Sequence, residues 1–285
     1  MSKLCIALAT FALATAASAA VPFKFGIAGY TFNRQDIDHA LAAMRKVDCH
    51  YLCIKDFHLK YDASDAEIAA FKAKLAAAGV EALAAGPLYF DNEKGARMLF
   101  DFAKRYGLKT VVGVPMKEVK GPNGKKQRVE DDAVLDIVEK LVAEYDIRFA
   151  IHNHGPDMPK LYPTAASVMK RIANRDRRIG LCLDIVHERR AGADPIEAIR
   201  KYGDRIYDVH VNNVLLVRDE KGRMPYRAVP APRGDLDIPA VFRALAETGY
   251  AGVCHLENAI GKNDDGSVLL ESVGYFRGCM DSISH

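Results

Sequence analysis

The sequence predicts a single (β/α)8 TIM barrel, an α/β fold in which parallel strands close into a cylinder inside a ring of helices. Short runs of β-branched and aromatic residues alternate along the chain with amphipathic segments that carry helix caps. Several runs are spaced by roughly 30 residues, the length of one strand–helix unit. Eight such units favour a closed barrel over an open doubly wound sheet. The chain contains no Gly-x-Gly-x-x-Gly or Walker sequence that would support the open alternative.

Each predicted strand is a short apolar run, and the predicted helices begin and end at recognisable caps. Ser64 can accept the Glu67 amide while the Glu67 carboxylate reaches back to Ser64, and Gly79 offers a left-handed stop. Asp237 followed by Pro239 gives a similar start signal. Strands are predicted at residues 24–29, 50–55, 81–86, 110–115, 148–152, 179–184, 206–210 and 252–257. Helices are predicted at residues 37–46, between 64 and 79, at 93–106, 129–144, 164–173 and 195–202, between 237 and 249, and at 267–279.

The first residues have the pattern of an export signal. Lys3 supplies a positive charge, residues 4–16 form a short apolar core, and Ala-Ser-Ala at 17–19 forms a small-residue cleavage site. We expect cleavage after Ala19, so that residues 20–285 form one barrel domain in a periplasmic or secreted protein. The apolar run is too short to cross a membrane, which takes about 20 residues.

Charge and cysteine usage narrow the class of partner. The formal net charge is +3, and basic and acidic residues are interspersed, so the chain lacks the electrostatic footprint of a nucleic-acid-binding protein. A small neutral ligand fits this balance better. Removal of the export signal leaves an odd number of cysteines, mostly within strand-like runs, so we expect no essential disulfide and no thiol catalysis. The sequence carries no signal for an oligomeric state.

Four side chains that can bind a metal ion each close a predicted strand in the second half of the chain: His152, Asp184, His210 and Glu257. The carboxyl ends of parallel barrel strands meet at one rim, where catalytic groups gather. We therefore expect the four side chains to bind one divalent metal ion. Two imidazoles with two carboxylates favour Mn2+, Co2+, Fe2+ or Zn2+ over Mg2+ or Ca2+. If the register of the fifth strand slips by two residues, His154 takes the place of His152.

The order of these rim motifs carries a family resemblance. The chain reads Asp184-Ile-Val-His187 after the sixth strand, His210 in His-Val-Asn-Asn after the seventh, and Glu257 in His-Leu-Glu-Asn after the eighth. With this order it resembles the xylose-isomerase-like TIM barrels, a group that contains sugar phosphate isomerases/epimerases, tagatose and psicose epimerases, and endonuclease IV. In that family Glu, Asp, His and Glu after strands five to eight bind a divalent metal. The resemblance covers residues 20–285 and implies metal-dependent chemistry on a sugar.

The chain departs from the family pattern after the fifth strand. The family commonly has Glu-Asn-His there, whereas this chain has His152-Asn153-His154. The resemblance implies that isomerases and epimerases of the family use the carboxylates after strands five and eight as paired proton carriers. The loss of one carboxylate argues against two-base epimerisation, although two imidazoles and two carboxylates still suit a metal ion.

Three residues are candidates for moving the proton. A divalent ion acts as a Lewis acid on a ketone oxygen and eases removal of the neighbouring proton. Glu257 is one candidate base, and Lys55 and His58, at and after the end of the second strand, are the others. Burial of Lys55 beside a cation would lower its pKa and make it a neutral base. A solvated lysine at a strand end, and an ordinary surface position for His58, are the alternatives.

Four further residues are candidates for binding substrate. His154 and His187 follow strand ends by two and three positions, and Asn153 lies between two histidines. The segment 213–232 after the seventh strand is long enough to cover the barrel mouth as a lid, or to be a flexible insertion. Arg233, at its end, is positioned to hold a substrate hydroxyl or carbonyl oxygen.

Export and the family resemblance together point to a non-phosphorylated carbohydrate substrate, since phosphorylated metabolites are largely confined to the cytoplasm. The chain resembles an exported branch of the family that is associated with 3-keto-glycosides. The leading hypothesis is therefore enolisation and β-elimination of a keto-sugar or 3-keto-glycoside. A keto-sugar isomerase or epimerase and a non-catalytic sugar-binding barrel are the alternatives. A DNA-repair site like that of endonuclease IV needs further His and Glu ligands that the earlier strands do not offer.

Overall fold

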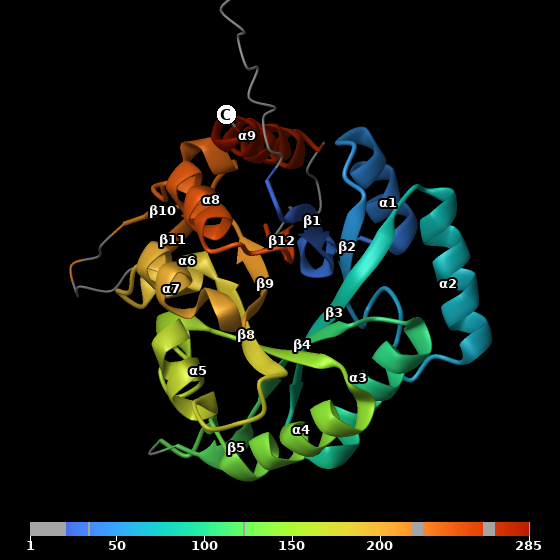
Figure 1. Cartoon of the computed structure of the whole chain (residues 1–285), viewed down its shortest axis with the longest axis vertical. Coiled ribbons are helices and arrows are strands. Elements are labelled where there is room, and N and C mark those ends of the chain that lie inside the picture. The colour runs from blue at the N-terminus through green and yellow to red at the C-terminus, as the bar shows by residue number, and fades with distance from the viewer. Residues whose placement is uncertain are drawn as a thin grey trace, which may run out of the picture.

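The computed structural model describes residues 21–33, 35–121, 123–217, 220, 225–258 and 266–284. Its central feature is a closed parallel barrel with the strand order β1-β12-β9-β8-β7-β4-β3-β2 (Figure 1). The barrel strands are β1 (Lys24–Ala28), β2 (Tyr51–Ile54), β3 (Glu81–Phe90), β4 (Thr110–Pro115), β7 (Arg148–His152), β8 (Ile179–Asp184), β9 (Ile206–Val211) and β12 (Val253–Leu256). The predicted TIM barrel is confirmed. The predicted export signal, residues 1–19, lies outside the described residues.

Helices alternate with the barrel strands and surround them (Figure 1). They are α1 (Ile37–Lys46), α2 (Asp65–Ala77), α3 (Glu93–Tyr106), α4 (Asp132–Tyr145), α5 (Ala165–Ile172), α6 (Ile185–Arg190), α7 (Pro195–Tyr202), α8 (Ile238–Glu247) and α9 (Ser267–Ile283). The capping box between Ser64 and Glu67 is present. None of the described helices is long and apolar enough to cross a membrane.

Two short antiparallel hairpins were not predicted. β5 (Lys117–Lys120) pairs with β6 (Lys126–Val129), and β10 (Val214–Leu216) pairs with β11 (Tyr226–Ala228). The predicted helix 129–144 therefore started too early, because Val129 ends a strand and Asp131 caps α4. Segment 213–232 likewise contains strands of its own. Both hairpins are too short or too polar to show the apolar alternation of a half-buried strand.

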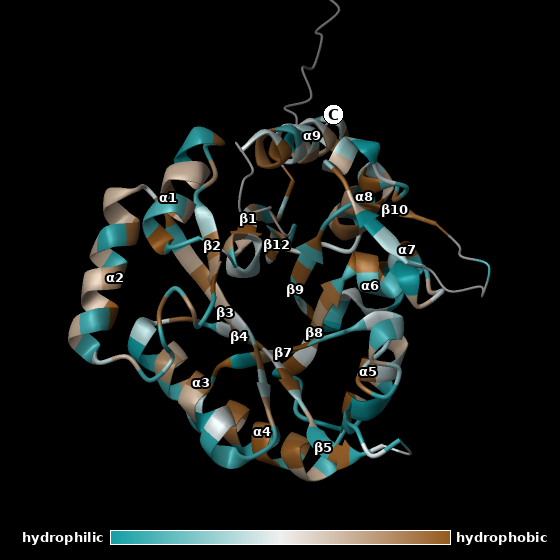
Figure 2. Cartoon of the chain, turned by 180° about the vertical axis from the view of Figure 1, so that it is seen from behind, coloured by the Kyte–Doolittle hydropathy of each residue, from teal (hydrophilic) through white to brown (hydrophobic). Residues whose placement is uncertain are grey.

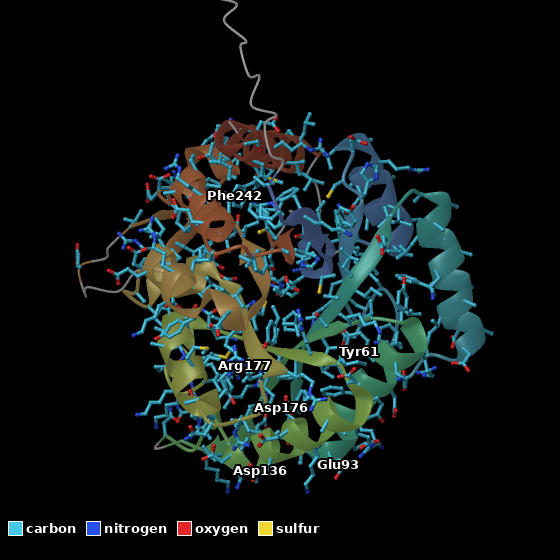
Figure 3. All side chains as sticks on the ribbon, in the orientation of Figure 1. Tyr61, Glu93, Asp136, Asp176, Arg177 and Phe242 are labelled. Atoms are coloured by element: carbon cyan, nitrogen blue, oxygen red, sulfur yellow. The ribbon has the colours of Figure 1, made fainter. Side chains whose placement is uncertain are left out.

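The core lies inside the barrel and between the barrel and its helices. Parallel strands are buried on both faces, so they read as continuous apolar runs, and β8 is buried at every position. Strand β8 is coloured largely hydrophobic, whereas the outer helices alternate between hydrophobic and hydrophilic residues (Figure 2). Phe242 lies on α8 (Figure 3). Its ring packs against those of Phe23 and Phe276, with centroids 5.5 and 5.8 Å away. Each such side chain contributes about 1.5–3 kcal/mol through burial.

The cysteines of the described region are part of this core. Cys49, Cys53, Cys182, Cys254 and Cys279 are all buried and unbridged. Burial raises the pKa of the Cys53 thiol to about 11, so that thiol is protonated and unreactive at neutral pH.

Strand β3 extends past its predicted end at Gly86 and reaches the rim at Phe90. Gly86 has a φ of +131°, and a Cβ there would lie 2.1 Å from the Val112 carbonyl oxygen. Glycine permits this close approach between β3 and β4. The pairing with β4 shifts register between Ala85 and Leu88. The consequence for the site is that Tyr89 is carried to the carboxyl rim of the barrel.

Candidate metal centre at the carboxyl rim of the barrel

The structure brings together the four residues that were expected to bind a metal. One ligand atom from each of His152, Asp184, His210 and Glu257 lies within 4.8 Å of the other three. The Nε2 atom of His152 lies 3.0 Å from His210 Nδ1, 3.8 Å from Asp184 Oδ2 and 3.7 Å from Glu257 Oε2. Neighbouring strands set this spacing, because Asp184 pairs directly with His210 in the β8–β9 ladder.

The donor set fits a divalent metal ion. Two imidazole nitrogens face each other in the buried cluster, and the carboxylates of Asp184 and Glu257 supply negative charge on the same side. His152 and His210 are 2% and 1% exposed, so the cluster is desolvated apart from its carboxylates. Nitrogen and carboxylate ligands in equal number suit Mn2+, Co2+, Fe2+ or Zn2+. His152, and not His154, is the fifth-strand member of this cluster.

Burial and neighbouring charges set the protonation of each member of the cluster. Burial lowers the pKa of His152, which keeps that imidazole neutral, as a metal ligand must be. Burial alone would lower the pKa of His210 and raise that of Glu257. The pKa of His210 is nevertheless raised, by the neighbouring Cys182 and Glu257, and the pKa of Glu257 is lowered, by His210 and His152. Glu257 therefore stays ionised at neutral pH.

Asp184 is oriented by the backbone that follows it. It is the N-cap of α6, and its Oδ1 accepts the amide of His187 at 2.7 Å. This bond satisfies one of the unpaired amides of the first helical turn. Its other oxygen, Oδ2, faces His152. One carboxylate thus both starts a helix and presents a ligand atom.

Asn153 was expected to contact substrate, but the structure places it inside the protein. Its side chain is fully buried and spans from β7 to β8. The amide of Asp184 donates to Asn153 Oδ1 at 2.8 Å, and Asn153 Nδ2 donates to the Asp184 carbonyl at 3.2 Å. Asn153 Nδ2 also donates to Glu188 Oε2 at 3.1 Å, and that oxygen accepts the Ala165 amide at 2.7 Å. Asn153 therefore fixes the backbone of a metal ligand.

His154 and His187, predicted to bind substrate, lie beside the cluster. His154 Nδ1 is 3.4 Å from His152 Nδ1 and 3.2 Å from the His152 carbonyl oxygen. The rings of His154 and His187 stack with centroids 5.4 Å apart. Burial lowers the pKa of His154 to about 2, so this imidazole is neutral. Neutral histidines can accept as well as donate hydrogen bonds.

Tyr89 is a site residue that the sequence reasoning missed. Its hydroxyl is hydrogen-bonded to His154 Nε2, and Arg128 of β6 lies 4.7 Å from the centre of its ring. Burial raises the pKa of Tyr89, so it is a neutral phenol that donates to His154. The predicted strand ended at Gly86 and so placed Tyr89 in a loop. In the structure Tyr89 lies near the end of β3, at the same rim as the four cluster residues.

Lys55 and His58 are bound to backbone groups of neighbouring segments. Lys55 Nζ donates to the Pro87 carbonyl and lies 3.6 Å from Asp56 Oδ1. Its side chain is 13% exposed, so it is not a solvated strand-end lysine. His58 Nε2 lies 3.2 Å from the Gln35 carbonyl oxygen, and burial lowers the pKa of His58. Neither belongs to the four-residue cluster.

Arg233 lies on the surface of the barrel's outer layer. Its side chain is 66% exposed. Its guanidinium donates to both carboxylate oxygens of Glu271 on α9, at 2.9 and 3.0 Å. A role in holding substrate would require this ion pair to open.

A TIM barrel whose carboxyl rim gathers two imidazoles and two carboxylates defines a class of metal-binding α/β barrels. The model of one family, the xylose isomerase-like TIM barrels, matches residues 31–279 of this chain. The protein belongs to that family. Solved members of the fold include a D-psicose 3-epimerase, which superimposes with a TM-score of 0.67 at 14% identity over 92% of this chain and all of that one.

Other relatives extend the comparison. The rhizopine catabolism protein MocC of Rhizobium meliloti is 28% identical over 130 residues, which is 42% of this chain and 38% of that protein. An inosose dehydratase of Clostridium botulinum is 28% identical over 135 residues, 43% of this chain and 44% of that protein. A mannonate dehydratase of Oceanobacillus iheyensis is 29% identical over 133 residues, 41% and 35% of the two chains. The chain thus matches less than half the length of these curated relatives.

Two solved structures of the same fold contain metal ions. The IolI protein with a bound zinc atom has a TM-score of 0.65 and 20% identity, covering 92% of this chain and 98% of that one. A xylose isomerase-like barrel from Mycobacterium smegmatis in complex with magnesium has a TM-score of 0.71 and 18% identity, covering 94% and 99%. At these identities the likeness establishes the fold. The metal-binding geometry of this chain rests on its own residues.

We predict that alanine substitution of His152, Asp184, His210 or Glu257 lowers metal occupancy, because each removes a donor atom. Asn153→Ala lowers metal affinity as well, by roughly 10- to 100-fold, because it releases the backbone of a ligand. Metal titration of chelator-treated protein measures both effects. His39→Ala, which removes an exposed histidine on α1, is the control. Unchanged occupancy in two or more of the four ligand variants would contradict the site.

Glu188 gives the structure a testable pH dependence. Burial raises its pKa to about 7 from an ordinary value of 4.5. Between these values the folded protein keeps a proton that the unfolded chain has released, so the free energy of unfolding falls as pH rises, by roughly 3 kcal/mol in total. Glu188→Gln removes this term. Denaturant unfolding of the metal-free wild type and of the metal-free variant, at about pH 5 and about pH 8, measures the free energy of unfolding of each. We expect the wild type to lose more stability than the variant, and an equal loss would refute the assignment.

Proposed function

We propose that the protein is a divalent-metal-dependent enzyme that acts on a non-phosphorylated keto-sugar or 3-keto-glycoside by enolisation and β-elimination. The observation that carries the proposal is the composition of the cluster. His152 places a neutral imidazole where the family commonly has a carboxylate. Glu257 is then the glutamate among the four cluster residues. A site with a single such proton carrier suits removal of a proton better than its exchange between two faces.

Metal ions are expected in this chemistry, and the residues present fit one. A bound divalent ion supplies Lewis acidity to a ketone oxygen and so acidifies the adjacent carbon. His152, Asp184, His210 and Glu257 would hold it. Relatives whose names describe sugar dehydratases support the general class of reaction, since dehydration of a sugar is itself an elimination.

The protein's own residues can manage the two proton transfers. In the elimination the C2–H bond breaks, its electron pair forms a C1–C2 double bond, and the C1–O bond breaks. Glu257 is the proposed acceptor of the C2 proton, because its lowered pKa keeps it ionised. Tyr89 is the proposed donor to the leaving oxygen, because its raised pKa keeps it protonated. His154 accepts a hydrogen bond from Tyr89 and so orients its hydroxyl, and the tyrosinate takes its proton back from solvent after the product leaves.

The proposed location of the protein supports the choice of substrate. The pattern of residues 1–19 predicts export, with cleavage after Ala19. Keto-glycosides without phosphate groups are chemically suited to an exported enzyme. The formal net charge of +3, spread over the chain, also gives no reason to expect a phosphorylated substrate. Retention of the uncleaved segment on the purified native protein would contradict this part of the proposal.

The decisive experiment follows the product of a 3-keto-glycoside by NMR in D2O with the metal-loaded enzyme. We expect release of the aglycone. Deuterium incorporation at C2 without fragmentation would instead identify an isomerase or epimerase. Binding without turnover would identify a sugar-binding barrel. Either of these outcomes overturns the lyase assignment.

His152→Glu is the matched variant for this experiment. It restores the carboxylate common in the family and adds a second proton carrier to the site. We expect metal binding to persist, elimination to slow, and proton exchange next to the ketone to become more frequent relative to elimination. If the ratio of exchange to elimination stays the same, residue 152 does not control the reaction outcome.

A further inference from the structure

The β5–β6 hairpin lies at the same rim of the barrel as the metal ligands. It follows the carboxyl end of β4 and begins at Lys117, two residues after that strand ends. Its far end is fastened to the segment that follows β7: the Glu130 amide donates to the Lys160 carbonyl at 3.1 Å, and Glu130 Oε1 accepts the Tyr162 amide at 2.8 Å. The Tyr162 carbonyl in turn accepts the His154 amide at 2.9 Å. The hairpin is therefore held against the segment that carries the site histidines.

A cleft of about 370 Å³ lies between the hairpin and this segment. That volume is within the range of small-molecule sites, roughly 300–1,000 Å³. Two of the residues that line the cleft, Met158 and Pro159, are apolar, and the rest carry polar or charged side chains. The full lining is Glu118, Lys126, Gln127, Arg128, Asp157, Met158, Pro159 and Lys160.

Most charges in this lining already have partners. Lys126 is paired with Glu118 at 2.7 Å. Asp157 is paired with Arg190 of α6 at 2.7 Å, and Lys160 Nζ donates to the Gln127 side chain at 3.4 Å. The lining holds three cationic and two anionic side chains, so it offers many donors and acceptors with a formal net charge of only +1. Such a surface matches a neutral, hydroxyl-rich ring better than an anion or a flat apolar group.

Arg128 links the cleft to the four-residue cluster through Tyr89 and His154. Arg128 lines the cleft, and its guanidinium also lies 4.7 Å from the centre of the Tyr89 ring. The Tyr89 hydroxyl binds His154, and His154 lies 3.4 Å from His152. The cleft is thus a few side-chain contacts from the reacting centre, on the side where Tyr89 would protonate a leaving group.

We propose that this cleft binds a second sugar ring, the one that leaves from C1 during elimination. This inference rests on the proposed function and narrows its substrate class to keto-disaccharides and larger keto-glycosides. Arg128 and Gln127 are its specificity-determining residues. They contact the departing ring through its hydroxyl groups, while the oxidised ring lies at the metal ligands.

The test compares two substrates of the metal-loaded enzyme: a 3-keto-disaccharide and the methyl 3-keto-glycoside of the same oxidised sugar. We expect Gln127→Ala and Arg128→Ala to raise KM for the disaccharide about tenfold, the cost of roughly one hydrogen bond to a charged or polar group. KM for the methyl glycoside should stay within twofold of wild type for Gln127→Ala. Lys120→Ala is the control, because Lys120 is exposed on the same hairpin but does not line the cleft.

The outcomes separate this inference from the function on which it rests. If Gln127→Ala changes KM equally for both substrates, or for neither, the second-ring site is overturned. If only Arg128→Ala changes KM equally for both substrates, Arg128 acts through Tyr89. If neither substrate is consumed, the proposed function fails. The cleft is then still tested by calorimetric titration with the unoxidised disaccharide and methyl glycoside. Tighter disaccharide binding that Gln127→Ala abolishes would support the site, and equal binding of the two would refute it.

Discussion

The site depends on one constraint: the barrel strands all run in the same direction around a closed sheet. Parallel pairing brings the carboxyl ends of β7, β8, β9 and β12 to one rim in fixed register, with His152 beside Cys182 and Asp184 beside His210. Residues far apart in the sequence thereby come within 4.8 Å of one another. The rim therefore needs no long-range loop to build a metal site, and its loops remain available for other tasks.

Bringing ionisable groups together in a buried place costs free energy, and the surrounding structure offsets it. Opposite charges on His210 and Glu257 oppose the desolvation of each. Asn153, directly after β7, is hydrogen-bonded to the backbone of Asp184. Its side-chain amide also donates to the buried carboxyl group of Glu188. Supporting bonds of this kind keep ligand atoms in place before a metal arrives. These bonds explain why the Asn153 side chain, which lies between two histidines in the sequence, is buried.

The chain combines a common barrel with local departures that bear on its chemistry. At residue 152 the chain has a neutral imidazole where the family resemblance leads us to expect a carboxylate, and nitrogen and oxygen donors still converge. The β5–β6 hairpin brings Arg128 over Tyr89 and borders a polar cleft beside the site. Both changes lie at the carboxyl rim, where a barrel can vary without disturbing its core. Substrate choice and reaction type can therefore diverge within one family.

The sequence by itself determined the fold and the four residues of the candidate metal centre, because both follow from local patterns. Burial on both faces gives every barrel strand a continuous apolar run, and uniform strand direction turns equivalent strand ends into neighbours. What only the tertiary structure decided was the role of residues whose partners are distant. Asn153 is hydrogen-bonded to the backbone of β8, and Arg233 pairs with Glu271. Tyr89 reaches His154 because Gly86 lets β3 continue beside β4. The β5–β6 hairpin escaped prediction for the same reason. Its strands pair through their backbones and consist mostly of charged residues, which leave no apolar period in the chain.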